Sequence, residues 1–194
     1  MDRAEEQRLI RLAAAGDREA AGVFIEAHQR SLFAYLVRIS GRPDVAEDIV
    51  QEAFVRVLTN LDRFDERYRF STWLFTIARR LYVNAMQKLR PAYDTDAVSA
   101  RGGFGPTPDA PVYAASDHVV ERDAIQELLM ELSEEQREAL VLFHQLDWPI
   151  ALIAEHLGMP EGTVKSHLHR GRRRLRSLLE AHEVHAQRVE DALA

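Results

Sequence analysis

Residues 90–116 interrupt the helical pattern of this sequence, and this break constrains the fold more than any other feature. The stretch shows no apolar periodicity and is rich in residues that end helices. These residues are Pro91, Gly102, Gly103, Gly105, Pro106, Pro108 and Pro111. Such a stretch predicts a flexible linker, so the 194 residues are expected to form two small domains. We predict an N-terminal domain at 1–90, a linker at 91–116, a C-terminal domain at 117–180 and an acidic tail at 181–194.

Apolar residues in the first half recur at the spacing of helices and not of strands. Asp44, followed three residues later by Glu47, predicts the start of one helix. Gly16 marks the end of an earlier helix, and a further helix is expected at about 71–89. The helix that begins near Asp44 carries an apolar stripe of Val45, Ala46, Ile49, Val50, Ala53, Phe54, Val57 and Leu58. The first half is therefore predicted to be entirely α-helical.

The sharpest pattern lies in the second half, between Pro149 and Leu179. A short apolar helix there ends at Gly158, and a longer basic helix begins near Glu161. Glycine supplies the left-handed turn that joins the two helices of a helix-turn-helix. Ser133, with a glutamine three residues on, predicts the start of the helix before this motif. The whole chain is thus predicted to be all-α, with a helix-turn-helix in its C-terminal domain.

The basic helix separates into two faces when it is projected at about 100° per residue. One arc contains Val164, Leu168, Gly171, Leu175, Leu178 and Leu179. The opposite side contains Lys165, Ser166, His169, Arg170, Arg172, Arg173 and Arg176. We expect the apolar arc to pack on the domain and the cationic side to contact DNA bases and phosphates. The alternative is an arginine-rich surface helix that faces only solvent.

Charge is segregated along the chain, although the net charge is only −6. Residues 61–93 carry +4, residues 94–160 carry −10 and residues 161–179 carry +5. Two basic stretches separated by an acidic one favour two contacts with polyanions, and the alternative is the variation of charge that occurs along any sequence. The N-terminus is charged and no stretch is apolar enough for a membrane span, so a cytoplasmic protein without membrane insertion is expected.

Patterns typical of enzymes are missing from the sequence. There is no cysteine, no H-E-x-x-H pattern, no glycine-rich phosphate loop and no nucleophile elbow. His167 and His169 lie about 200° apart around one helix, which does not favour a shared metal ion. We therefore predict no enzymatic activity, no metal site and no cofactor.

Four segments resemble the extracytoplasmic-function sigma factors of bacterial RNA polymerase, a class of the sigma-70 family. "AEDIVQEAFVRVL" and "RFSTWLFTIARRLYVN" resemble their N-terminal domain. "LSEEQREALVLF" and "IAEHLGMPEGTVKSHLHRGRRRLRSLL" resemble their C-terminal promoter-binding domain. The resemblance implies a factor that binds RNA polymerase core, directs it to specific promoters and assists promoter melting. The implied partners are the β′ clamp and β flap of the polymerase, promoter DNA and an anti-sigma factor.

The same resemblance assigns three sets of contact residues. Binding to the polymerase clamp is expected of Asp48, Gln51, Glu52 and Phe54, with a purely structural role as the alternative for Phe54. Contact with the downstream (−10) promoter element is expected of Phe64, Tyr68, Trp73, Thr76, Arg79 and Arg80. A purely structural role is the alternative for each of the three aromatic residues. Contact with the upstream (−35) element is expected of Lys165, Ser166, His169, Arg170 and Arg173.

Two other kinds of protein are weighed against this interpretation. A conventional regulator that binds DNA without joining polymerase would explain residues 149–179 but would leave the first half without a role. An interaction-only module would find its main support in the acidic residues 180–194. Binding to purified core polymerase distinguishes both alternatives from a sigma factor.

Overall fold

The computed structural model describes residues 2–89 and 117–193, and all regular structure within these ranges is helical. The all-α class predicted from the sequence is therefore confirmed. The chain divides into two compact units, one formed mainly by residues before 90 and the other mainly by residues after 116. The linker predicted at 91–116 lies outside the described residues. Among the helices of the described ranges, none is long and apolar enough to cross a membrane.

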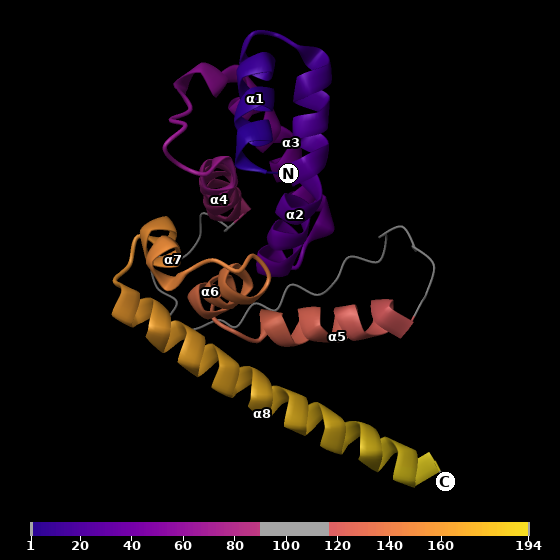
Figure 1. The fold of residues 1–194 in the computed structure, drawn as a ribbon. Coiled ribbons are helices and arrows are strands. Elements are labelled where there is room, and N and C mark those ends of the chain that lie inside the picture. Colours follow the sequence, from indigo (N-terminus) through magenta and orange to yellow (C-terminus); the bar gives the residue numbers. More distant parts are fainter. Residues whose placement is uncertain (1, 90–116, 194) are drawn as a thin grey trace. The chain divides into compact units, whose positions relative to one another are not determined.

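Within residues 2–89, the first unit contains four α-helices (Figure 1) and one short 3-10 helix, η1. Its elements are α1 (Arg3–Ala14), α2 (Arg18–Ser40), α3 (Pro43–Thr59), η1 (Leu61–Arg63) and α4 (Phe70–Leu89). The carboxylate of Asp17 accepts hydrogen bonds from the backbone N–H groups of Glu19 and Ala20, at 3.0 and 3.1 Å, and so caps α2. The expected break between the first two helices at Gly16 is confirmed, and α4 begins within one residue of its predicted start.

Helix α3 begins differently from the sequence prediction. We expected Asp44 to cap it, but Pro43 is the first helical residue and Arg42 stands at the cap position without a side-chain cap bond. Proline has no backbone N–H that needs a hydrogen-bond acceptor, and its ring already fixes φ near the helical value. It can therefore occupy the first helical position without a side-chain cap. Asp44 instead accepts a 2.6 Å hydrogen bond from the Arg42 guanidinium, which lowers the pKa of Asp44.

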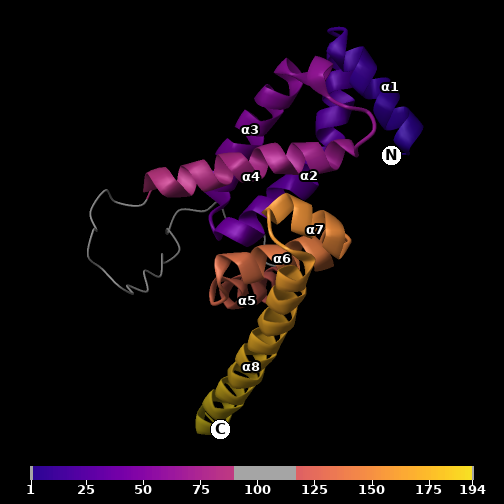
Figure 2. The same ribbon diagram turned by 90° about the vertical axis from the view of Figure 1, so that its left-hand side faces the viewer.

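The core of the first unit is formed where α4 crosses α3 (Figure 2). Phe24, Leu32, Val57, Phe70 and Leu74 are fully buried. The rings of Phe24 and Phe70 meet edge to face, with centroids 4.1 Å apart. Because this core covers the apolar stripe of α3, the opposite face of α3 remains exposed, and the connection from α3 to α4 runs over the surface as a loop.

The second unit contains the predicted helix-turn-helix. Its elements are α5 (Asp117–Met130), α6 (Glu134–His144), α7 (Ile150–Leu157) and α8 (Glu161–Leu193). The hydroxyl of Ser133 accepts a 3.3 Å hydrogen bond from the backbone N–H of Gln136, so the predicted start of α6 is confirmed. Helix α8 packs along both α6 and α7. Leu142, Ile153 and Val164 are fully buried at the centre of the unit.

Helix α8 is longer than the sequence analysis predicted. We expected the basic helix to end near Leu179, but the helix continues to Leu193 through most of the predicted acidic tail. Residues 172–193 contain neither glycine nor proline and are rich in good helix formers, so no residue stops the helix. The Leu179 side chain is 45% exposed, so its predicted place in the buried arc is wrong.

Candidate nucleic-acid and polymerase interfaces

The turn between α7 and α8 has the geometry of a helix-turn-helix. Gly158 ends α7 with a left-handed backbone, at φ +68°. The next N–H, of Met159, bonds to the carbonyl of Ala154 at 3.0 Å. The carbonyl of Pro160 accepts from the N–H groups of Thr163 and Val164, at 2.9 and 3.1 Å, and starts α8. The helix-turn-helix predicted from the sequence is confirmed.

The buried side of α8 lies very close to α6. Val164 and Leu168 are buried, and Gly171 follows them on the same face. A Cβ atom placed on Gly171 would lie only 2.8 Å from Cδ1 of Leu140 and 3.5 Å from Cβ of Gln136. The glycine therefore allows an approach between α8 and α6 that a larger residue would permit only if the Leu140 side chain moved. This contact fixes the rotation of α8 about its axis.

The predicted upstream-element residues all lie on the exposed side of α8. Lys165, Ser166, His169, Arg170 and Arg173 are exposed. The hydroxyl of Ser166 donates to the carbonyl of Gly162 at 3.0 Å, and Nε of Arg170 donates to the carbonyl of Ser166 at 3.3 Å. Lys165 pairs with Glu161 at 3.7 Å across one exposed helical turn. Exposed pairs of this kind contribute about 0–1 kcal/mol, so Lys165 can readily exchange Glu161 for another acceptor.

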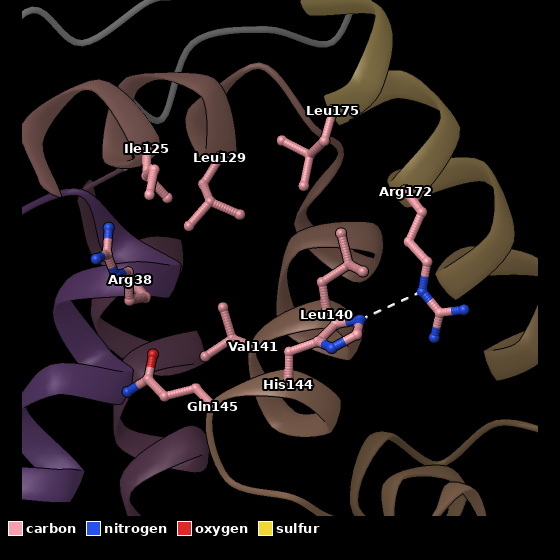
Figure 3. Close-up of a pocket in the computed structure, with 9 residues that line it drawn as sticks. All are labelled: Arg38, Ile125, Leu129, Leu140, Val141, His144, Gln145, Arg172 and Leu175. Carbon is pink, nitrogen blue, oxygen red and sulfur yellow. Dashed lines mark hydrogen bonds between the residues drawn. The ribbon is translucent and has the colours of Figure 1, made fainter. Parts of the chain in front are cut away.

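Arg172 does not share the orientation of these residues. Its Nε donates to Nε2 of His144 at 3.2 Å, as the dashed line in Figure 3 shows. The guanidinium carbon also lies 5.2 Å from the ring centroid of Phe143. The helical projection placed Arg172 with the outward cations, but its long side chain folds back onto α6. The sequence could not indicate this, because the projection gives the direction of Cβ and not of the end of the chain.

Several predicted downstream-element residues surround the loop at 62–69, between α3 and α4. Phe64, Phe70 and Trp73 form an aromatic cluster, with Phe64 5.6 Å from Phe70 and 5.3 Å from Trp73 between ring centroids. Phe64 and Trp73 are half-buried. Tyr68 is different, because its side chain is 59% exposed. The cluster packs against the loop, and Tyr68 is more exposed than Phe64, the other aromatic residue of the loop.

Two residues of this loop hold each other in a tight turn. Arg67 contacts both carboxylate oxygens of Asp65, and its Nη2 lies 2.6 Å from Oδ2. The backbone N–H of Arg67 also donates to Oδ1 of Asp65 at 3.0 Å. These hydrogen bonds lower the pKa of Asp65. The N–H of Tyr68 bonds to the carbonyl of Asp65 at 3.0 Å, so the turn places Tyr68 at the end of the loop.

The polar downstream candidates follow on α4. The hydroxyl of Thr76 donates to the carbonyl of Thr72 one turn earlier, at 2.8 Å. Arg80 is exposed one further turn along the helix, and Arg79 lies beside it, partly covered. Trp73, Thr76 and Arg80 are spaced three and four residues apart, which places them along one side of α4. This side follows directly from the 62–69 loop.

The predicted clamp residues of α3 do not all share one face. Asp48, Gln51 and Glu52 are exposed, and Glu52 pairs with Arg56 at 2.6 Å. Phe54 is only 5% exposed and belongs to the core. This burial agrees with the purely structural role given above as the alternative for Phe54. Val55 was not among the predicted clamp residues, and it is 61% exposed beside Gln51 and Glu52. Its position off the apolar stripe of α3 was the available signal.

Comparison with known proteins decides the family. Residues 24–91 match the family model for Sigma-70 region 2, and residues 122–175 match that for Sigma-70, region 4. The ECF RNA polymerase sigma factor SigW of Bacillus subtilis (strain 168) is 34% identical over 182 residues, which cover 89% of this chain and 96% of that protein. The chain belongs to the ECF sigma factors. As a sigma factor, it binds RNA polymerase core and directs the enzyme to specific promoters.

Two solved structures share the fold. CnrH, solved in complex with the cytosolic domain of CnrY, aligns with a TM-score of 0.67 at 22% identity, over 91% of this chain and 98% of that one. RpoE of Bartonella quintana, solved with the anti-sigma factor NepR, aligns with a TM-score of 0.61 at 24% identity, over 80% and 94%. At these identities the similarity establishes the fold alone.

The two family models place the geometry described above within the sigma factor. Region 2 includes the exposed face of α3, the 62–69 loop and α4. Region 4 includes the helix-turn-helix and the first half of α8. Helix α1 lies before region 2 and the end of α8 lies after region 4. The chain accordingly belongs to a family of regulatory transcription initiation factors.

Proposed function

We propose that this sigma factor reads a two-part promoter with two separate surfaces, one on each unit, and opens the DNA at the downstream part. The observation that carries the proposal is the exposed row of polar and cationic side chains on α8, directly after the helix-turn-helix turn. In the other unit, the 62–69 loop presents an exposed aromatic side chain beside α4. The first surface suits duplex DNA, and the second suits unpaired bases.

The α8 surface is proposed to enter the major groove of the upstream (−35) element. Lys165, Ser166 and His169 lie in the first turns of the helix, where a recognition helix reaches base edges. The guanidinium of Arg170 can donate hydrogen bonds to both major-groove acceptors of a guanine. Arg173, further along the helix, would contact a phosphate. The buried contact of Gly171 with Leu140 supports this assignment, because it fixes which side of α8 faces outward.

The 62–69 loop is proposed to capture a base that leaves the duplex at the downstream (−10) element. Removing a base from its stack costs a few kcal/mol, and stacking on an aromatic ring can recover about 1–3 kcal/mol. Tyr68 is suited to this role because it is 59% exposed. Phe64 and Trp73 would act mainly by supporting the loop. Thr76, Arg79 and Arg80 would contact the strand that continues along α4.

The exposed face of α3 is proposed to bind the β′ clamp of RNA polymerase, while region 4 contacts the β flap. Asp48, Gln51 and Glu52 supply polar contacts, and Val55 supplies an apolar one. An exposed apolar side chain among polar ones is common at protein interfaces. Phe54 would contribute indirectly, because it anchors α3 in the core.

We also propose that an anti-sigma factor regulates this protein in the cytoplasm, where RNA polymerase works. RpoE of Bartonella quintana was solved with the anti-sigma factor NepR, so a sigma factor of this fold does form such a complex. A partner that covered the α3 face or the α8 surface would prevent polymerase or promoter binding. No cofactor is needed for these roles, because the polymerase carries out the chemistry.

The proposed base capture predicts a specific defect for Tyr68→Ala. A promoter is first selected from a randomised library with holoenzyme containing the wild-type chain. On this duplex promoter, Tyr68→Ala is expected to lower the rate of open-complex formation by about 5-fold to 100-fold, since one base stack is lost. On the same promoter with the downstream element already unpaired, the defect should be much smaller. Permanganate footprinting measures the rate on both templates.

Tyr68→Phe is the matched control, because it keeps the aromatic ring and removes only the hydroxyl. It should open the duplex promoter at close to the wild-type rate. If Tyr68→Ala lowered the rate of open-complex formation equally on duplex and pre-opened templates, base capture by Tyr68 would be contradicted. If the wild-type chain bound duplex DNA but gave core polymerase no promoter activity, a conventional helix-turn-helix regulator would be the better interpretation.

A further inference from the structure

Helix α1 lies outside both family-model matches, yet it contacts the loop that carries Tyr68. Arg3, Gln7 and Arg11 are spaced four residues apart and so form one row along α1. All three side chains reach the same part of the 62–69 loop, at Glu66 and Arg67. We call Arg3, Gln7 and Arg11 the α1 latch.

The contacts of the α1 latch act on the backbone of the loop as well as on a side chain. Nη2 of Arg3 donates to the carbonyls of Glu66 and Arg67, at 3.3 Å each. Nε2 of Gln7 donates to the carbonyl of Glu66 at 3.5 Å. Nη1 of Arg11 lies 3.3 Å from Oε2 of Glu66. Bonds to successive carbonyls fix the path of the chain immediately before Tyr68.

Helix α1, which carries the α1 latch, is anchored in the first unit by its buried side. Leu9 and Ile10, on the other side of α1, are 5% and 3% exposed and anchor the helix in the first unit. Glu6 lies 3.4 Å from the ring of His28 on α2, and that ring contacts Phe70 at the start of α4. Figure 2 shows α1 beside the segment that joins α3 to α4. The loop is therefore held between α1 and the aromatic cluster.

The pair of Arg11 and Glu66 is too exposed to add much to global stability, at 61% and 41%. Its effect is local, on a loop that the Asp65–Arg67 turn and the aromatic cluster also hold. We propose that the α1 latch positions the 62–69 loop for promoter reading, so that Arg3, Gln7 and Arg11 help to set how well the downstream element is selected. This inference rests on the proposed role of the loop in base capture.

The test compares holoenzymes that contain wild-type, Arg3→Ala/Arg11→Ala, Glu66→Ala or Arg8→Ala chains. Arg8 is the matched control, since it is an exposed arginine on α1 outside the latch row. The readout is a selectivity ratio, the rate of open-complex formation on the selected promoter divided by that on promoters with one downstream base changed. The selectivity ratio is expected to fall about 3-fold to 10-fold for the latch variants, which are Arg3→Ala/Arg11→Ala and Glu66→Ala. Arg8→Ala should leave it unchanged.

A charge exchange, Arg11→Glu with Glu66→Arg, should recover part of the ratio that either single change removes. Melting temperature and affinity for core polymerase should stay at wild-type values throughout. The inference is overturned if the ratio is unchanged in the latch variants, or if it falls only together with melting temperature or polymerase affinity. Tyr68→Ala is included in each series. If it also leaves the ratio unchanged, the proposed function of the loop fails as well.

Discussion

Replacing Arg170 by alanine is expected to remove most of the preference for the upstream promoter element. A guanidinium that bonds both acceptors of a guanine contributes about 1–3 kcal/mol of discrimination, or roughly 5-fold to 150-fold in rate. Initiation should fall by this factor on a promoter with its selected upstream element. It should fall far less on a promoter whose upstream element is scrambled. Single-round transcription on the two templates measures the difference.

Arg176→Ala is the matched control, because Arg176 is exposed on α8 about two turns further from the helix-turn-helix turn. A residue at that position is expected to meet phosphate, so its loss should weaken all promoters alike and reduce the salt dependence of binding. Affinity for core polymerase should be unchanged in both variants. If Arg170→Ala reduced polymerase binding instead, the assignment of the α8 faces would be wrong.

The second large effect is expected from Gly171→Val. A Cβ at this position would already lie 2.8 Å from the buried Leu140 side chain, and valine adds two further carbon atoms. Such overpacking typically costs about 1–3 kcal/mol, because the helices must separate or the neighbouring side chains must leave their preferred rotamers. The second unit should therefore unfold at a lower urea concentration. Use of the upstream element should fall as well, since α8 would rotate or move away from α6.

The unfolding of the second unit can be followed separately from that of the first unit in the full chain. In a Trp73→Phe background, Trp148 is the remaining tryptophan, and it lies in the second unit. Gly162→Val is the matched control, because Gly162 is an exposed glycine of the same helix, and a Cβ added there would meet no neighbouring atom within 4 Å. It should be neutral or slightly stabilising, since valine has a higher helix propensity than glycine. Equal destabilisation by both variants would show that the contact with Leu140 is not the cause.

Local patterns predicted much of this fold because the relevant forces act between near neighbours. Gly158 between a short apolar helix and a basic helix indicated the helix-turn-helix, and Ser133 indicated the start of α6. The start of α3 was misplaced because two local signals competed, and proline at the first helical position prevailed over an aspartate cap. The end of α8 was misplaced because a change in charge does not by itself stop a helix.

The parts of the site that the sequence did not predict depend on contacts between distant segments. Nothing near Arg172 in the sequence indicates that His144 and Phe143 turn its side chain toward α6. Likewise, Arg3 and Arg11 meet Glu66 only because the first unit folds α1 against the loop. The resemblance to sigma factors assigned roles to Phe54 and Tyr68 alike, and only their burial separates a core residue from an exposed one.

The most direct test of the account is binding to purified core RNA polymerase. Wild-type chain is compared with an Asp48→Ala/Gln51→Ala/Glu52→Ala variant and with a control triple variant, Glu26→Ala/Gln29→Ala/Arg30→Ala, at exposed positions of α2. We predict tight binding by wild type and control, and a loss of about 100-fold for the α3 variant, as expected when several contacts of one interface are removed. Binding of the α3 variant at the wild-type level would place the polymerase interface elsewhere. Failure of the wild-type chain to bind core would contradict the account as a whole.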